Sequence, residues 1–255
     1  MNPKVFTLTV IAGLGVISTF MLLEPIPQDP GYHNFADSRI VIGIPNGLDV
    51  LSNVPLIVIG VWGIVFTAKM LKKSGSKAPA LLYFIFFIGI FFTGFGSSYY
   101  HHAPSNDTLF WDRLPMTVAF MGFFCAVICE MVSLRASLIL ILPLLAVGAG
   151  SVYYWHWSEA LGRGDLRLYG LVQFLPMILI FLILIMYKLP VNYLSYIIAA
   201  MFFYFVSKLT EVLDIQIFQL LGIMSGHTLK HVLAAAGTCC ILIMLHKRSN
   251  QLRYE

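Results

Sequence analysis

Charged residues are scarce in this chain, and their scarcity rules out one large class of protein. Of its 255 residues, 11% are Asp, Glu, Lys or Arg, whereas 59% are hydrophobic. A soluble globular domain carries about 25% charged residues, so this chain has too few to cover a surface that faces water. The composition therefore indicates a polytopic membrane protein, with the lipid bilayer as its first expected partner.

Cysteine is also rare, and its positions exclude two further kinds of structure. The four cysteines, all within long apolar runs, are Cys125, Cys129, Cys239 and Cys240. Because no spaced cysteine pair lies in a loop, neither a disulfide framework nor a zinc–thiolate site is expected. The sequence also lacks an internal or inverted repeat, which disfavours a transporter.

Long apolar runs are what the chain has in abundance. A helix needs about 20 apolar residues to cross a bilayer. Eight runs approach that length: roughly residues 4–23, 48–69, 80–100, 114–133, 136–154, 168–187, 193–213 and 229–245. No water is available inside the bilayer to satisfy backbone groups, and the alternation of barrel strands is missing, so we expect eight helices. The predicted fold class is all-α, a polytopic membrane domain without an appended soluble module.

The first run has an alternative interpretation as a signal peptide, because Lys4 precedes it. It is long for the apolar region of a signal peptide, however, and the following segment LEPIPQDP lacks a small-residue cleavage pattern. We therefore expect a retained membrane helix.

The basic residues predict an orientation in the membrane. If eight helices alternate, ten of these residues fall on one side: Lys4, Lys69, Lys72, Lys73, Lys77, Arg135, Lys188, Lys247, Arg248 and Arg253. Ten of the twelve acidic residues fall on the other side, the exceptions being Glu130 and Glu255. The positive-inside rule makes the basic side cytoplasmic and places both termini there. The net charge of +4 thus reflects topology, and nucleic acid is not an expected partner.

Polar residues gather at the ends of three apolar runs. Ser97 and His101 are four residues apart near the end of the third run, and His227 and His231 are four apart at the start of the last. Positions i and i+4 share a helix face, so each pair points one way. Asp112 lies just before the fourth run. The predicted topology puts all five residues at one membrane depth, near the non-cytoplasmic side.

This set of residues is typical of a metal-dependent hydrolase. Nitrogens of His101, His227 and His231 can bind zinc and leave a fourth position for water. Zinc lowers the pKa of that water towards about 7 and polarises a carbonyl. Asp112 can then orient or deprotonate the water, while Ser97 can hydrogen-bond a developing oxyanion.

Other polar residues have simpler interpretations. A lone histidine near the interface is usually just an amphipathic residue at the headgroup level. Three histidines fit this description: His33, His156 and His246. His102 points about 100° away from His101 on a helix and is expected in a loop or behind the ligands. Lys208 and Glu211, three residues apart, are expected to form a structural ion pair.

Together the site residues resemble the alkaline ceramidase family, within the CREST superfamily of membrane hydrolases. The superfamily pattern is a Ser-x3-His in one helix, an Asp opening the next, and a His-x3-His in the last. Here it reads Ser97–His101, Asp112 and His227–His231. The segment LDVLSNVP at residues 48–55 also resembles the start of the family's first core helix, and the resemblance covers roughly residues 30–245.

The resemblance implies a fold and an activity. The fold would be a seven-transmembrane-helix, ceramidase-like core in residues 25–255, with residues 1–24 as an extra N-terminal transmembrane helix. The activity would be that of a zinc-dependent amidohydrolase, with the metal on the three histidines and with Ser97 and Asp112 as catalytic residues. The substrate would be a membrane lipid, ceramide or a related acyl lipid, cleaved at its amide to a sphingoid base and a fatty acid.

The resemblance also raises the question of a second metal, because family members can hold calcium before the first core helix. Oxygen donors are available here at Asp37, Asn46 and Asp49. Asn46 stands where a glutamate is expected, so calcium is a weaker expectation than zinc.

Two other functions remain open from the sequence. Adiponectin-type receptors share a similar constellation, and a lipid sensor or receptor of that kind would hold structural zinc without turnover. Short loops on the cytoplasmic side disfavour it, because they offer little surface to a signalling partner. A proton-coupled transporter would line a path across the bilayer with charges, whereas the ionisable residues here gather at one end. No oligomeric state is predicted.

Overall fold

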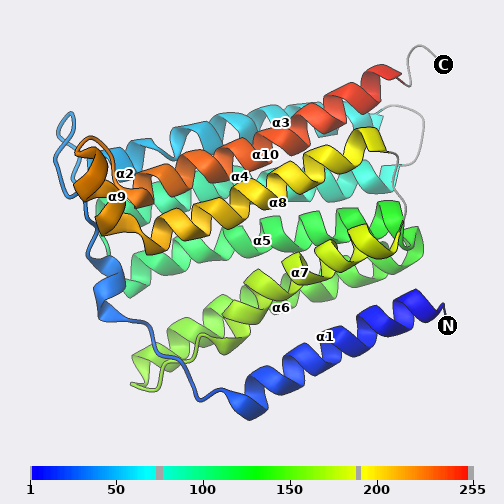
Figure 1. The fold of residues 1–255 in the computed structure, drawn as a ribbon, viewed down its shortest axis with the longest axis horizontal. Coiled ribbons are helices and arrows are strands. Elements are labelled where there is room, and N and C mark those ends of the chain that lie inside the picture. The colour runs from blue at the N-terminus through cyan, green and yellow to red at the C-terminus, as the bar shows by residue number, and fades with distance from the viewer. Residues whose placement is uncertain (1, 73–76, 188–190, 252–255) are drawn as a thin grey trace. The chain divides into compact units, whose positions relative to one another are not determined.

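The protein is mostly helical in the part of the chain that the computed structural model describes, residues 2–72, 77–187 and 191–251 (Figure 1). Its elements are α1 (Pro3–Leu22), the 3-10 turn η1 (Pro30–His33), α2 (Gly47–Leu51), α3 (Val54–Lys72), α4 (Lys77–His102), α5 (Asn106–Met131), α6 (Leu134–Ala160), α7 (Arg167–Met186), α8 (Val191–Val212), α9 (Asp214–Leu221) and α10 (Gly226–Gln251). Within these ranges, eight helical segments are long and apolar enough to span a membrane. The all-α polytopic prediction is confirmed.

One predicted boundary is wrong, and it concerns a site residue. The fourth apolar run begins near residue 114, with Asp112 expected at the outer start of its helix, but α5 begins earlier, at Asn106, and carries Asp112 in its second turn. The reason is a reciprocal cap: the Thr108 backbone N–H donates to Ser105 Oγ at 3.2 Å, and the Ser105 N–H donates to Thr108 Oγ1 at 3.0 Å. Such a cap starts a helix in polar sequence, where an apolar run gives no signal.

The chain folds into two compact units that interleave along the sequence. The first, here the α1 unit, comprises Met1–Pro30, Ile64–Gly89 and Arg113–Leu189; the second, the α10 unit, comprises Gly31–Gly63, Ile90–Asp112 and Pro190–Glu255. Helices α3, α4 and α5 each contribute residues to both units. The predicted division, with residues 1–24 as an extra helix and residues 25–255 as the core, differs from these two units and stays a prediction.

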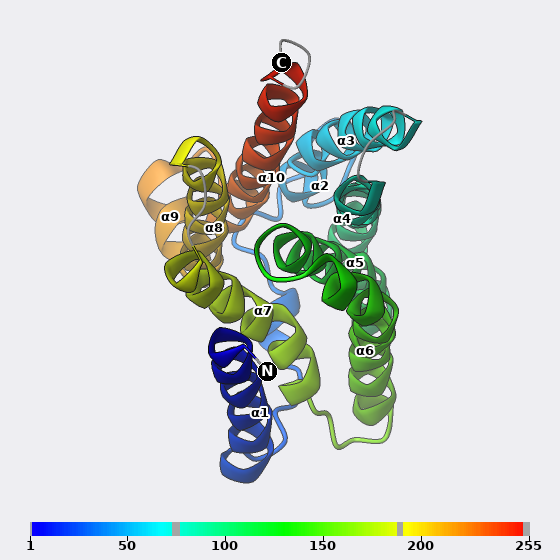
Figure 2. The same ribbon diagram turned by 90° about the vertical axis from the view of Figure 1, so that its right-hand side faces the viewer.

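In the α1 unit, α7 packs against both α1 and α6 (Figure 2). The most buried large side chains of the α1 unit include Trp155, Tyr83, Phe87 and Ile180. By contrast, α1 has no buried residue. The segment after α1 is nevertheless fixed, because the Leu166 N–H donates to the Ile26 carbonyl at 2.8 Å.

In the α10 unit, α10 lies along α8, as both ribbon views show, and also contacts α2 and α9 (Figures 1 and 2). Ile197 of α8 and Ile241 and Leu245 of α10 are fully buried in this unit. Every residue of the predicted metal and catalytic set belongs to it.

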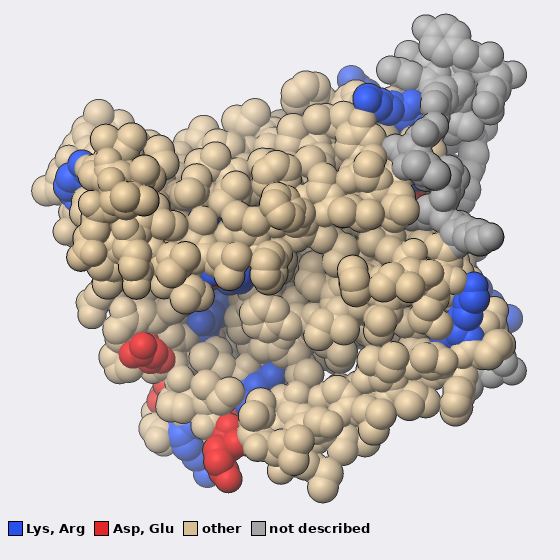
Figure 3. Space-filling view, in the orientation of Figure 1, with Lys and Arg blue, Asp and Glu red and all other residues tan. Residues whose placement is uncertain are grey.

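The surface of the described residues suits a lipid environment. The face in Figure 3 shows few charged side chains, and large apolar groups such as Leu142 and Phe202 are exposed. Of the basic and acidic residues used to predict topology, Lys73, Lys188, Arg253 and Glu255 lie outside the described residues. All four cysteines are free thiols, as expected.

Candidate metal centre

Three histidines from two helices converge in the α10 unit. One ring nitrogen from each of His101, His227 and His231 lies within 4.8 Å of the others. The ring centroids are 4.7 Å apart for His101 and His227, 4.8 Å for His101 and His231, and 5.1 Å for His227 and His231. All three side chains are buried. The predicted convergence of the histidines is therefore present, and the group can hold a metal ion.

The local structure of α10 explains how two of these histidines are presented. The Thr228 N–H donates to Ser225 Oγ at 2.9 Å, and the His227 N–H donates to Asp214 Oδ1 of α9 at 2.7 Å. These bonds satisfy N–H groups that a helix start leaves without partners. The first turns of α10 are thus fixed, and His227 and His231 project from one face of it.

The surroundings of the His101 imidazole indicate whether these residues fit a metal ion. The side chain is fully buried, and neither Nδ1 nor Nε2 has a hydrogen-bond partner. A buried polar group left unpaired costs about 1–3 kcal/mol, so it needs a partner of another kind. A metal ion between the three rings meets that need. Imidazole nitrogens suit zinc, copper, iron and nickel, so the donor set fits zinc without selecting it alone.

His231 is oriented by hydrogen bonds behind it. Ser52 Oγ donates to the Asp49 carbonyl at 3.0 Å and lies 2.8 Å from His231 Nδ1. Because the single hydroxyl proton goes to the carbonyl, Ser52 Oγ accepts the proton of Nδ1–H. The other nitrogen, Nε2, then carries the lone pair and faces the histidine group. Such support from behind fixes the tautomer of a metal-binding histidine.

The remaining predicted site residues lie around this group. Ser97 is buried, with Oγ 3.4 Å from His231 Nε2. Asp112 is buried on α5, where Trp111 and Asp112 pack directly against Gly96 of α4. Its carboxylate interacts electrostatically with Lys230. The ligand group found in the described residues consists of histidines, so Asp112 stands beside it rather than within it.

A charged network adjoins the histidines, and the sequence did not predict its link through Lys230. Lys230 Nζ lies 2.9 Å from His227 Nε2 and donates to Glu211 Oε1 at 2.8 Å. Glu211 also binds Lys208 at 2.6 Å, as predicted, and accepts from the Tyr32 hydroxyl at 2.8 Å. The sequence did contain a signal for this network, because Lys230 lies between the two predicted ligands His227 and His231 in an apolar helix. A charge buried there needs a partner.

An aromatic side chain covers part of the group. The Phe35 ring lies 4.6 Å from the His101 ring and 5.0 Å from the His227 ring, centroid to centroid. Phe35 comes from the segment between η1 and α2, so this segment helps to exclude water from the histidines. Among the other histidines, His102 is the exposed last residue of α4, so the expectation that it lies in a loop or behind the ligands is wrong. His33 is held by Tyr100 and Asn106 at 3.0 and 3.1 Å.

Of the three residues considered for calcium, Asp37 has both carboxylate oxygens paired, whereas Oδ2 of Asp49 is buried without a hydrogen-bond partner. Arg39 forms a bidentate pair with Asp37 at 2.7 Å for both bonds, and its hydrogen bonding holds the pKa of the Asp37 carboxyl below its usual range. Asn46 donates to the His101 carbonyl at 2.8 Å. Asp49 Oδ1 accepts from the Thr228 hydroxyl at 2.5 Å. A calcium site is still only a prediction.

Comparison with known proteins does not indicate a function for this chain. No family model matches this chain, and no curated protein does. What the arrangement can do therefore follows from its parts: three imidazoles for a cation, a hydroxyl next to one of them, and a buried carboxylate with a lysine.

Proposed function

We propose that this protein is a zinc-dependent hydrolase of the membrane that cleaves the amide bond of ceramide or a related acyl lipid. The observation that carries the proposal is the buried three-histidine group, with the unpartnered imidazole of His101 at its centre. The resemblance of Ser97–His101, Asp112 and His227–His231 to alkaline ceramidases supplies the substrate class.

The reaction adds water across the C–N bond: hydroxide goes to the acyl carbon and a proton to the leaving nitrogen. His101, His227 and His231 would hold the metal, which when bound polarises a carbonyl and acidifies water. The Ser97 hydroxyl donates a hydrogen bond to the oxygen that gains charge during attack. Asp112 accepts the proton from water and passes it to the amine.

The surroundings of the site support a lipid substrate. Large apolar side chains are exposed on the spanning helices, so acyl chains reach the protein through the bilayer. Phe35 shields the histidines, and a site with little water strengthens the electrostatic interactions within it.

The test measures metal content and fatty-acid release on the same detergent-purified samples, wild type beside His231→Ala. We expect about one zinc per chain in the wild type, with loss of both metal and ceramide hydrolysis in the variant. His102→Ala is the matched control, because His102 adjoins His101 but is exposed; it should keep both.

Two outcomes would contradict the proposal. Retention of metal and hydrolysis by His231→Ala would show that the histidine group is not the site. Zinc bound at the group without turnover of any acyl lipid would instead favour a receptor or sensor with structural zinc.

A further inference from the structure

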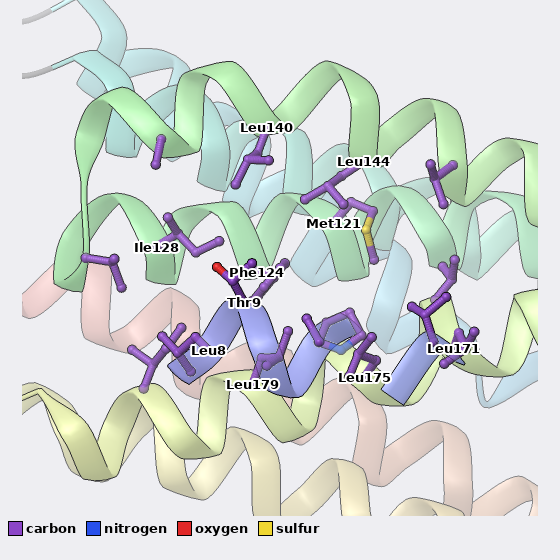
Figure 4. A pocket seen from close by; sticks show the side chains of 18 of the residues that line it. Leu8, Thr9, Met121, Phe124, Ile128, Leu140, Leu144, Leu171, Leu175 and Leu179 are labelled. Atoms are coloured by element: carbon purple, nitrogen blue, oxygen red, sulfur yellow. The ribbon is translucent and has the colours of Figure 1, made fainter. Parts of the chain in front are cut away.

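The α1 unit contains an apolar cavity of about 480 Å³ that the proposed hydrolase chemistry does not use. Four helices line it: α1, α5, α6 and α7. Figure 4 shows labelled side chains from each, such as Leu8, Phe124, Leu144 and Leu175, directed into one space. The position of α1 explains why the space exists.

Polar contacts hold helix α1 to the rest of its unit at both ends, and between them α1 packs against α7. Near its start, Lys4 Nζ donates to the Met186 carbonyl at 2.5 Å. Just beyond its end, Arg167 donates to the Leu23 carbonyl at 2.6 Å. Between these points no residue of α1 is buried, although Gly15 allows a close approach to Leu175. The helix thus forms an outer wall over a space that side chains do not fill.

The lining excludes water and polar ligands. Its one hydroxyl, on Thr9, donates to the Val5 carbonyl at 2.9 Å and is already satisfied. A buried water needs two to four polar partners, which this lining does not offer. An empty apolar space of this size forfeits dispersion contacts on all sides, so an apolar occupant is favoured.

The dimensions select the form of that occupant. Lining residues of α1 run from Val5 to Val16, a length of about 17 Å at 1.5 Å per residue. That volume is the space open to the centre of a water molecule, so spread over this length it gives a channel about 6 Å wide for atom centres and about 9 Å wide between its walls, narrower than a helix of about 10–12 Å. One leaflet of the hydrocarbon core is about 15 Å thick. A single extended acyl chain matches both length and width.

We propose that this cavity, here the α1 cavity, is a binding site for one acyl chain of a membrane lipid or free fatty acid, with α1 as its wall. The proposal is independent of the metal centre, because all of its residues belong to the α1 unit. It also gives the N-terminal helix a role: α1 converts a lipid-facing surface of α7 into a partly covered site.

The experiment uses the full chain in lipid vesicles and two probes: palmitic acid with a terminal diazirine, and a phosphatidylcholine carrying the same chain. After illumination, labelled peptides are mapped by mass spectrometry. We expect labels on cavity-facing positions such as Leu8 and Leu175 from at least one probe. Labelling by both indicates that the chain suffices for binding, and labelling by one identifies the head group that the site accepts.

Two pairs of variants separate the cavity from the general lipid shell. Ala12→Phe and Ala136→Phe place a phenyl ring in the cavity from α1 and from α6, whereas Leu14→Phe and Leu138→Phe place one at exposed positions of the same two helices. We expect the cavity labels to fall about fivefold or more in the first pair and to stay unchanged in the second, because a filled core space cannot accept further atoms without strain.

Equal labelling in all four variants, or labels confined to outward-facing residues of α1, would overturn the proposal and leave only surface lipid. If one filling variant fails to fold, the other keeps the test decisive. Zinc content, measured on the same samples, should not change, so failure here and failure of the proposed hydrolase are distinguishable.

Discussion

At the scale of single residues, Lys230 is the side chain whose position most alters the view of the site. Its ammonium group lies 2.9 Å from His227 Nε2, and a positive charge beside the histidine group opposes a cation there. Glu211 holds Lys230 in place, and Lys208 and Tyr32 in turn hold Glu211.

We therefore expect Lys230→Met to bind zinc about tenfold more tightly than the wild type, because both the competing donor and its charge are removed. Competition with a chromophoric chelator measures the affinity. Lys208→Met is the control, since Lys208 binds the other oxygen of Glu211, and its effect should be small. An unchanged or weaker affinity in Lys230→Met would show that the lysine does not oppose the metal.

At the scale of helices, the contact between α4 and α5 fixes the distance between two predicted catalytic residues. A Cβ atom at Gly96 would collide with the Trp111 carbonyl and approach the Asp112 Cα at 3.2 Å. Ser97 follows Gly96 directly, so this close approach of the two backbones sets Ser97 and Asp112 relative to each other.

We expect Gly96→Ala to lower the free energy of unfolding by about 1–3 kcal/mol, as overpacking does, and to reduce hydrolysis more than zinc content. Thermal unfolding and activity assays measure the two effects. Gly150→Ala on α6 is the control, because an added Cβ there meets nothing within 4 Å. Normal activity in Gly96→Ala would mean that this helix contact does not position the site.

The segment between η1 and α2 is attached by an ion pair that makes a pH prediction possible. Asp37 is buried and binds Arg39, which also donates to the Ile223 carbonyl at 2.8 Å just before α10. Hydrogen bonding from Arg39 lowers the pKa of Asp37, and Arg167 does the same for Asp165. A carboxyl whose pKa is lower in the folded state stabilises the fold above its unfolded pKa, about 3.9 for Asp. That contribution is lost as the pH falls through the folded value.

We expect thermal stability to be level above about pH 5 and to fall below about pH 4. Asp37→Asn should lower the melting temperature at pH 7 and flatten the acid part of the curve, whereas Glu24→Gln, at an exposed position, should not. Differential scanning fluorimetry across pH measures both. An Asp37→Asn curve parallel to the wild type at every pH would exclude this pair as a source of the dependence.

At the scale of the whole molecule, eight spanning segments and the excess of basic residues on one side, ten of sixteen, predict the topology. Arg163 lies in the loop after α6, and Lys77 lies at the start of α4. If the helices alternate in direction, these two residues lie on opposite sides of the membrane. A membrane-impermeant maleimide applied outside intact cells should label Arg163→Cys and should label Lys77→Cys only after permeabilisation. The reverse pattern would invert the orientation and place the metal centre on the cytoplasmic side.

Most of the helical fold could be predicted from the sequence, and so could the group of histidines. The spans follow from local apolar runs, and a spacing of four residues places Ser97 with His101 and His227 with His231 on one helix face each. The start of α5 could not be predicted in the same way, because the Ser105 and Thr108 cap lies in polar sequence.

The sequence by itself thus determined that this is a helical membrane protein with a histidine pair at the start of one helix and a third histidine at the end of another. Those are local properties of hydropathy and spacing. Only the tertiary structure decided that Lys230 contacts His227, that Ser52 orients His231, and that α1 lines a cavity together with α7. These depend on how distant segments pack, which no local pattern encodes.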